Sequence, residues 1–216
     1  MDAAEAELAA YVGLSAGRVR LASFVSALST FIPRAVAQLA ANHPRVQVGL
    51  IDAHSDDALK MLVSGEVDIV VGFRTDEDVA GSGLRSVFLG EDPIYLLVPD
   101  GAPTSMSDLR DSDWVAGCSR CRAQLGDLAA RFNFVPKIRF SSDDVIVKQA
   151  IVAAGLAVAT TPGLALQLHH ADGVTATPIP GARRRIFAFT YGDPPDPPAT
   201  VTLLDALTKV TSSLRR

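Results

Sequence analysis

The residues best suited to chemistry in this 216-residue chain are two cysteines, Cys118 and Cys121, which form a Cys-x-x-Cys pair. Such a pair is either redox-active or half of a zinc site. Zinc takes about four ligands, and no second cluster stands at ligand spacing, since His169 and His170 are adjacent and far along the chain. We therefore predict no metal and no cofactor. Two interpretations of the thiols stay open: redox chemistry, or small side chains near a helix start.

Hydroxyl side chains follow several predicted strands, at the point where each strand ends. Open parallel sheets bind ligands at the carboxyl ends of their strands, where the following helices also present free N–H groups. Arg74 adds a cation there, so this chemistry favours a small organic anion such as a carboxylate. We expect ligand-binding positions at Ser23, Phe24, Val25, Ser26, Ser55, Phe73 and Arg74 in the first half of the chain, and at Cys118, Ser119 and Thr161 in the second.

Each of these polar residues also has a purely structural interpretation. Ser55 and its counterpart Ser142 are predicted N-caps, because each precedes two acidic residues that suit the positive first turn of a helix. Arg74 precedes Thr-Asp-Glu-Asp and is able to pair with a neighbouring acid. The run of three arginines at 183–185 is expected on a solvated edge.

No catalytic motif accompanies these residues. The sequence has no Gly-x-Ser-x-Gly elbow, no phosphate-binding loop, no Gly-x-Gly-x-x-Gly after a strand and no His-Glu-x-x-His. An enzyme on the same scaffold needs a titratable group poised in the cleft, and neither Arg74 nor the hydroxyls supply a general base. We predict a binding protein and not an enzyme.

The elements that position these residues form two similar halves. The order strand–helix–strand–helix–strand occurs over about 18–73 and again over about 113–161, and a Ser-Asp-Asp phrase opens the second helix of each half. The run Val67–Phe73 is too apolar for a half-exposed strand, which indicates a parallel strand covered on both faces. The fold class is therefore α/β, with two open, Rossmann-like sheets.

Two long β-rich segments connect the halves. We place hinge strands near 92–99 and 184–192, so that the first lobe is discontinuous. Lobe I then comprises 18–92 and 192–216, and lobe II comprises 93–191.

The composition excludes some partners. A formal net charge of −4 and a pI near 5.5 argue against binding of a phosphate backbone by this chain alone. No uninterrupted apolar stretch reaches the roughly 20 residues that span a bilayer, and the acidic start lacks the basic region of a signal peptide. We expect a cytoplasmic protein that makes no membrane contact.

Four motifs occur in a fixed order. They are Pro33 within the first helical stripe, His-Pro-Arg-Val-Gln-Val before the second strand, Leu-x-x-Gly-x-x-Asp at Leu62, Gly65 and Asp68, and Val-Ala-Ala-Gly-Leu-Ala-Val-Ala-Thr-Thr-Pro at 152–162. In the order and spacing of these motifs the chain resembles, over nearly its whole length, the effector-binding domain of LysR-type transcriptional regulators.

The resemblance implies a two-lobed, periplasmic-binding-protein type II-like fold that binds a small effector at the positions given above. It also implies an antiparallel homodimer of this domain, a tetramer of the full-length regulator, and DNA contact through an N-terminal winged helix-turn-helix. That part has no counterpart in the sequence. We therefore expect a piece of a longer regulator, with residues 1–17 as the remnant of its linker helix.

Two alternatives remain. A solute-binding protein of a transport system shares the two-lobed hinge but needs a secretory signal. A thiol-based redox sensor of the same regulator family is the second alternative. In the peroxide-sensing branch of that family the reactive cysteines are well separated in sequence, unlike Cys118 and Cys121.

Overall fold

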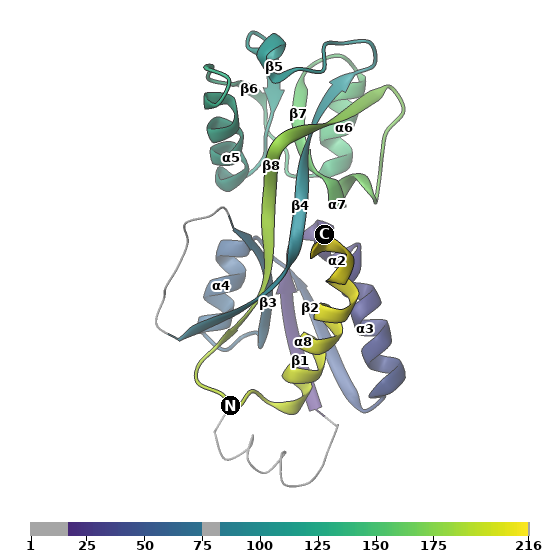
Figure 1. Ribbon diagram of the computed structural model, residues 1–216, viewed down its shortest axis with the longest axis vertical. Helices are drawn as coiled ribbons and strands as arrows, with labels where there is room; N and C mark the ends of the chain where they lie inside the picture. The colour runs from purple at the N-terminus through teal and green to yellow at the C-terminus, as the bar shows by residue number, and fades with distance from the viewer. Residues whose placement is uncertain (1–16, 75–82, 216) are drawn as a thin grey trace. The chain divides into compact units, whose positions relative to one another are not determined.

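The computed structural model describes residues 17–74 and 83–215, apart from the side chains of Arg74, Ser213 and Arg215. The chain divides into two compact units (Figure 1). Unit 1 comprises the described residues up to Glu91 and those from Arg184 onward, and unit 2 comprises Asp92–Arg183. Each unit packs helices on a sheet that contains parallel strands, which confirms the predicted α/β class.

The sheet of unit 1 is built on three parallel strands. They are β1 (Gly17–Ser23), β2 (Val46–Asp52) and β3 (Ile69–Arg74), and β1 lies between the other two. On its other side β3 pairs with the last part of β8 (Val174–Tyr191), which runs antiparallel to it. The apolar residues of β3 from Ile69 to Val71 are fully buried, as expected for a strand covered on both faces.

Helices cover both faces of this sheet (Figure 1). The helical elements of unit 1 are α2 (Val25–Leu28), α3 (Phe31–Asn42), α4 (Ser55–Val63), α8 (Pro198–Val210) and the 3-10 turn η2 (Thr211–Arg215). α4 packs on β3, whereas α3 packs against α8, and α8 in turn contacts β1. Pro33 lies in the first turn of α3, where a missing N–H removes no helical hydrogen bond.

The Leu-x-x-Gly-x-x-Asp motif has a structural explanation in unit 1. Gly65 follows α4 with φ +75°, a conformation that glycine adopts without strain. The carboxylate of Asp68 accepts hydrogen bonds from the backbone N of Arg20 at 2.7 Å and from its Nη2 at 3.0 Å. The same guanidinium donates to the carbonyl O of Gly65 at 2.8 Å. The motif therefore joins the end of α4 and the start of β3 to β1.

Unit 2 repeats this arrangement around a second set of parallel strands. Its strands are β5 (Asp113–Val115), β6 (Lys137–Phe140) and β7 (Val158–Pro162), and β5 lies between the other two. Its helices are α5 (Ser119–Ala130), α6 (Val145–Ala153), α7 (Gly163–Leu166) and the 3-10 turn η1 (Met106–Leu109). Trp114, Leu125 and Leu96 are among the buried residues of its core.

Two long strands belong to both units. β4 (Leu84–Pro99) and β8 pass from one unit to the other, at Glu91–Asp92 and at Arg183–Arg184. Among the described residues the hydrogen-bonded order is β2-β1-β3-β8-β4-β7-β5-β6. The two Rossmann-like sheets that we expected are thus joined by these two strands into one hydrogen-bonded order. The reason is that β4 and β8, with 16 and 18 residues, are long enough to supply a strand to each unit.

Two predicted helix caps were also wrong. α4 begins at Ser55 itself, and His54 occupies the N-cap position without a side-chain cap hydrogen bond. α6 is capped by Asp144, whose Oδ1 accepts from Ile146 N at 2.7 Å and from Val147 N at 3.1 Å. Ser142 is not the cap of α6; its hydroxyl instead accepts a hydrogen bond from Asp144 N.

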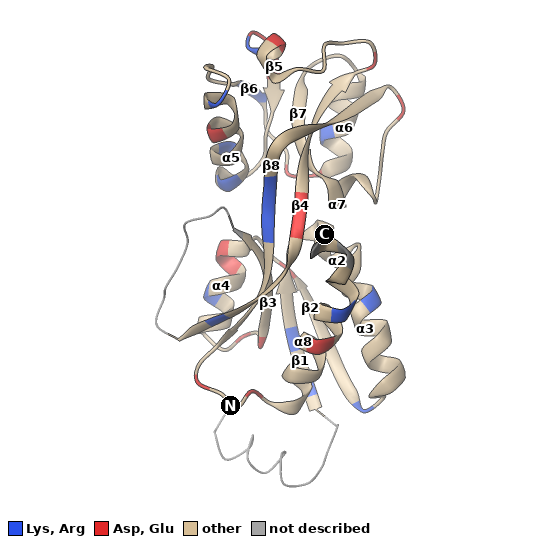
Figure 2. Cartoon of the chain, viewed as in Figure 1, with Lys and Arg blue, Asp and Glu red and all other residues tan. Residues whose placement is uncertain are grey.

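Charged residues lie on many of these elements, among them α4 and β8 (Figure 2). Asp56 and Asp57 lie in the first turn of α4, where the helix dipole favours negative charge. The arginine run 183–185 forms a basic segment of β8. Among the described residues, no helix combines the length and the hydropathy needed to cross a bilayer.

Candidate functional site

Unit 1 brings several of the predicted residues together at the carboxyl ends of β1 and β3. β1 and β3 are parallel neighbours, so Phe24, which follows β1, lies near Phe73 of β3. The two rings meet edge to face, with their centroids 5.2 Å apart. Ser26, in α2, is buried beside them, with 6% of its surface exposed. We refer to these three residues, together with Arg184, as the arginine cluster.

Arg184 of β8 completes this cluster. Its Cζ atom lies 4.5 Å from the ring centroid of Phe24 and 4.7 Å from that of Phe73. Its Nη2 atom donates a hydrogen bond to Ser26 Oγ at 2.7 Å. Only 4% of the residue is exposed. Cation–π contacts and a hydrogen bond therefore hold a guanidinium in a fixed position at the strand ends.

The sequence reasoning missed Arg184. We placed the whole run 183–185 on a solvated edge, and this is wrong for its middle residue, whereas Arg183 and Arg185 are exposed. Successive side chains of a strand point to opposite faces. Arg184, Ile186 and Ala188 share one face of β8, and all three are buried. The alternation of Arg184 with the apolar residues that follow it was the signal that could have identified the buried arginine.

The predicted serines of unit 1 differ in what their hydroxyls do. Ser23 Oγ donates to the carbonyl O of Val71 at 2.8 Å, so this hydroxyl helps to join β1 to β3. Ser55 Oγ is buried and has no hydrogen-bond partner among the described residues. It lies close to Gly72, since a Cβ added to this glycine would stand 3.5 Å from the hydroxyl oxygen. Buried polar atoms are rarely left unpaired, so Ser55 marks a place where a ligand or water atom would gain a hydrogen bond.

Two predicted residues of unit 1 contribute less. Val25 begins α2 and is 53% exposed, so it is not part of the buried arginine cluster. Arg74 is the last residue of β3, and its side chain lies outside the described residues. Arg184 is a buried cation at this edge of the unit 1 sheet.

In unit 2 the predicted residues lie where β5 and β7 end. Cys118 is the N-cap of α5 and Ser119 is its first residue, whereas Thr161 lies near the end of β7. β5 and β7 are parallel neighbours, so these residues share one edge of the sheet. The hydroxyl of Thr161 is buried and, like that of Ser55, has no hydrogen-bond partner in the described part of the chain.

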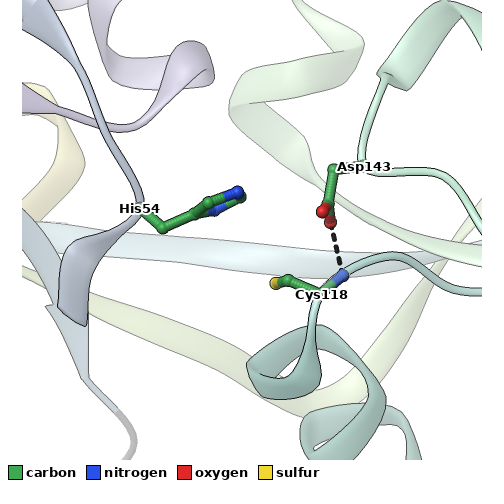
Figure 3. A group of neighbouring side chains, drawn as sticks. All are labelled: His54, Cys118 and Asp143. Carbon is green, nitrogen blue, oxygen red and sulfur yellow. Dashed lines mark hydrogen bonds between the residues drawn. The ribbon is translucent and has the colours of Figure 1, made fainter. Parts of the chain in front are cut away.

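The loop before α5 is held firmly. The backbone N of Cys118 donates to Asp143 Oδ1 at 2.7 Å (Figure 3). Arg122 donates from Nε to the carbonyl O of Gly117 and from Nη2 to Ser141 Oγ. A Cβ at Gly117 would lie 1.8 Å from Asp143 Oδ1, so any side chain there would force the two loops apart. The sequence contained no local signal for Asp143, because its partner is 25 residues away.

The two thiols of unit 2 are close to each other. Cys118 and Cys121 are free, and their Sγ atoms lie 3.0 Å apart. Burial and the hydrogen bond to Cys118 raise the pKa of the Cys121 thiol to about 12. The Cys121 sulfur is therefore protonated at neutral pH.

Within unit 1, the arginine cluster and the unpaired hydroxyl of Ser55 suit binding of an anion with an apolar body. A fixed guanidinium attracts a carboxylate, and it does so more strongly where the protein excludes water. Phe24 and Phe73 offer aromatic surface beside it. None of the residues in the arginine cluster is a general base at neutral pH.

Comparison with known proteins identifies the family. The family model of the LysR substrate binding domain matches residues 13–212. The chain belongs to the LysR substrate-binding domain family. This family is one of transcriptional regulators, which favours the regulator over the transport alternative.

Solved structures of LysR-type proteins share this fold. The effector binding domain of BenM with its effector benzoate has a TM-score of 0.76 at 15% identity, covering 91% of this chain and 92% of BenM's. That of QuiR in complex with shikimate has a TM-score of 0.78 at 13% identity, covering 93% and 100%. The Corynebacterium glutamicum OxyR C206 mutant has a TM-score of 0.79 at 17% identity, covering 99% and 70%. Among curated proteins, no sequence matches the chain.

The unpaired state of Ser55 in this LysR-family domain leads to a prediction about stability. Ser55→Ala removes a buried hydroxyl that makes no hydrogen bond, so we expect the free energy of unfolding to stay equal or to rise by up to about 1 kcal/mol. Asp144→Ala removes the N-cap of α6 and should lower the free energy of unfolding by about 1 kcal/mol. Urea denaturation of the two variants measures both values. A loss in Ser55→Ala as large as that in Asp144→Ala would contradict this assignment.

Proposed function

We propose that this domain senses a small organic anion and that Arg184 binds the anionic group of that effector. The observation that carries the proposal is the burial of this guanidinium between Phe24 and Phe73, with Ser26 as its hydrogen-bond partner. Side-chain and backbone groups that fix a cation in advance lower the entropic cost of binding. The unpaired hydroxyl of Ser55 supplies a further hydrogen bond to the effector.

The chemical class follows from these contacts. A planar guanidinium matches a carboxylate with two parallel hydrogen bonds. The two phenylalanine rings favour a ring or another compact apolar body attached to that carboxylate. BenM and QuiR, which have the same fold, are described with benzoate and shikimate, and both compounds are ring carboxylates. We therefore propose a ring-bearing carboxylate as the effector.

The proposed response is a shift between conformations. We propose that the effector also contacts Cys118, Ser119 and Thr161 of unit 2, and that β4 and β8 act as the hinge between the units. A ligand moves such an equilibrium only by the difference in its affinity for the two arrangements. The unpaired Thr161 hydroxyl supports a contact in unit 2, because an effector that reaches it pairs a buried polar atom.

We further propose that the response reaches DNA through a dimer of this domain and a tetramer of the full-length regulator. In this proposal DNA contact belongs to an N-terminal domain of the full-length regulator; full-length CbnR, which shares this fold, was solved in complex with its target DNA. α6 supports a dimer because its solvent face is apolar: Ile146 is 61% exposed and Val147 is 44% exposed. Ala150 and Ala153 extend this face along the helix. Exposed apolar faces of this kind mark interaction surfaces, and a second copy of the domain is the partner that we propose.

The effector proposal predicts a specific loss in Arg184→Lys. A screen of ring carboxylates, with benzoate and shikimate as the first probes and benzamide as the neutral analogue, should yield carboxylates that raise the melting temperature of the domain. Calorimetry of a ligand found in this way should show affinity reduced roughly 10- to 100-fold in Arg184→Lys, because the fork of donors is lost.

Arg183→Lys is the matched control for this variant, since Arg183 neighbours Arg184 but is exposed. It should retain wild-type affinity. Equal losses in the two variants, or an unchanged affinity in Arg184→Lys, would remove Arg184 from the effector site.

The dimer proposal predicts that a charge on α6 separates the protomers. Ile146→Asp should convert a dimer to a monomer in sedimentation equilibrium, because the buried carboxylate would lack a partner in the interface. Val63→Asp places a charge on another exposed apolar position, in α4, and should leave the dimer intact. A monomeric wild-type domain, or dissociation in both variants, would contradict the role of α6.

A further inference from the structure

We propose that Cys118 and Cys121 form a reversible disulfide by thiol–disulfide exchange, with Cys118 as the attacking sulfur and Cys121 as the resolving thiol. The pair would make this domain responsive to the thiol–disulfide balance of its surroundings. This is a second input, separate from the proposed effector.

The geometry of the pair favours a bond within the chain. Both sulfurs are free, and they lie 3.0 Å apart in the first turn of α5. A disulfide has a sulfur–sulfur distance of about 2.0 Å, so an approach of about 1 Å closes the bond. Side-chain rotation can supply this approach, and no change in strand pairing is needed.

The positions of the two cysteines in α5 assign their roles. Cys118 is the N-cap, and its Sγ accepts a hydrogen bond from the backbone N of Cys121 at 3.4 Å. This N-cap position places the Cys118 sulfur at the N-terminal end of a 12-residue helix. The side chain of Cys121 lies one turn further along, and both residues are half-buried; burial raises the pKa of the Cys121 thiol to about 12. Cys118 therefore supplies the nucleophile, and Cys121 keeps its proton until the second step.

Charged neighbours act on the pair in opposite directions. Lys148, which is buried on α6, favours a thiolate near Cys121, whereas the carboxylate of Asp143 disfavours it. Asp143 also accepts the hydrogen bond from the backbone N of Cys118 (Figure 3). This hydrogen bond holds the backbone of Cys118 while its side chain rotates.

The exchange balances with a low-molecular-weight disulfide as the oxidant, for which glutathione disulfide serves as the probe. In the first step the Cys118 thiolate attacks one sulfur of glutathione disulfide, a mixed disulfide forms, and glutathione leaves as a thiolate. In the second step Cys121 gives up its proton, its thiolate attacks the Cys118 sulfur of the mixed disulfide, and the second glutathione leaves and takes up the proton. The two cysteines lose two electrons, and one glutathione disulfide becomes two glutathione molecules.

Disulfide formation would also change the effector site, and this part of the inference rests on the proposed function. Cys118 is one of the residues of unit 2 that we propose as effector contacts. The closed disulfide fixes the Cys118 sulfur against Cys121 and removes its S–H donor. We expect the reduced and oxidised domains to bind the same carboxylate with affinities that differ at least threefold.

The test uses the domain equilibrated in buffers of varied glutathione to glutathione disulfide ratio, followed by rapid alkylation with iodoacetamide and mass spectrometry. Because the chain has two cysteines, every thiol signal belongs to this pair. We expect a monomeric oxidised form that has lost two hydrogens and carries no alkyl group. In the reduced form Cys118 should be alkylated at least ten times faster than Cys121.

Single variants separate the two roles. Cys121→Ser should accumulate a mixed disulfide of glutathione on Cys118, whereas Cys118→Ser should accumulate little on Cys121. Equal accumulation in the two variants would overturn the assigned roles. The proposed disulfide within the chain would be wrong if both thiols were fully alkylated at every glutathione ratio. It would also be wrong if oxidation gave only disulfide-linked dimers. If the two thiols stay reduced in glutathione disulfide and bind Cd²⁺ stoichiometrically, the pair is a metal site and the proposal is wrong.

The affinity measurement is a separate readout. If the disulfide forms but both forms bind the carboxylate equally, the link to the effector site is wrong and the redox pair stands. If no carboxylate binds either form, the proposed function fails, and the glutathione titration still decides the disulfide.

Discussion

Arg184 is a permanent cation with 4% of its surface exposed, and its burial constrains everything around the strand ends of unit 1. Moving a charge out of water costs several kcal/mol even after the protein relaxes. The rings of Phe24 and Phe73 and the hydroxyl of Ser26 offset part of this cost. An anion that binds beside the guanidinium offsets more of it, and water exclusion strengthens the attraction. The proposed effector site therefore rests on the attraction between this cation and an anion, although the net charge of the chain is −4.

The parts of the fold that depend on local pattern could be predicted from the sequence. Apolar runs such as that of β3, and the glycine after α4, mark their elements without reference to the rest of the chain. Arg184 could not be recognised while the three arginines were treated as one charged run. The alternation of side chains along a strand divides them between two faces, and burial of the middle one depends on Phe24 and Phe73, which are more than 100 residues away in sequence.

The Ser-Asp-Asp motif occurs twice, and its two copies cap their helices differently. At the second phrase, Asp143 accepts a hydrogen bond from Cys118, and Asp144 caps α6. At the first phrase, Ser55 is already inside α4, and its hydroxyl has no partner among the described residues. In unit 2 the neighbouring loop determines which residue caps the helix, and in unit 1 the packing of α4 on β3 determines it. Neither factor can be predicted from the three residues of the motif alone.

The claim on which the account depends is that Arg184 contacts the effector. The most direct measurement follows the side-chain Nε–Hε signal of Arg184 in a ¹⁵N-arginine-labelled domain during titration with a carboxylate that the domain binds, with assignment by Arg184→Lys. The account predicts that this signal shifts in proportion to occupancy, while that of the exposed Arg183 stays in place. If the carboxylate binds and shifts other signals but leaves that of Arg184 unchanged, the guanidinium is a structural cation and the proposed effector site is wrong.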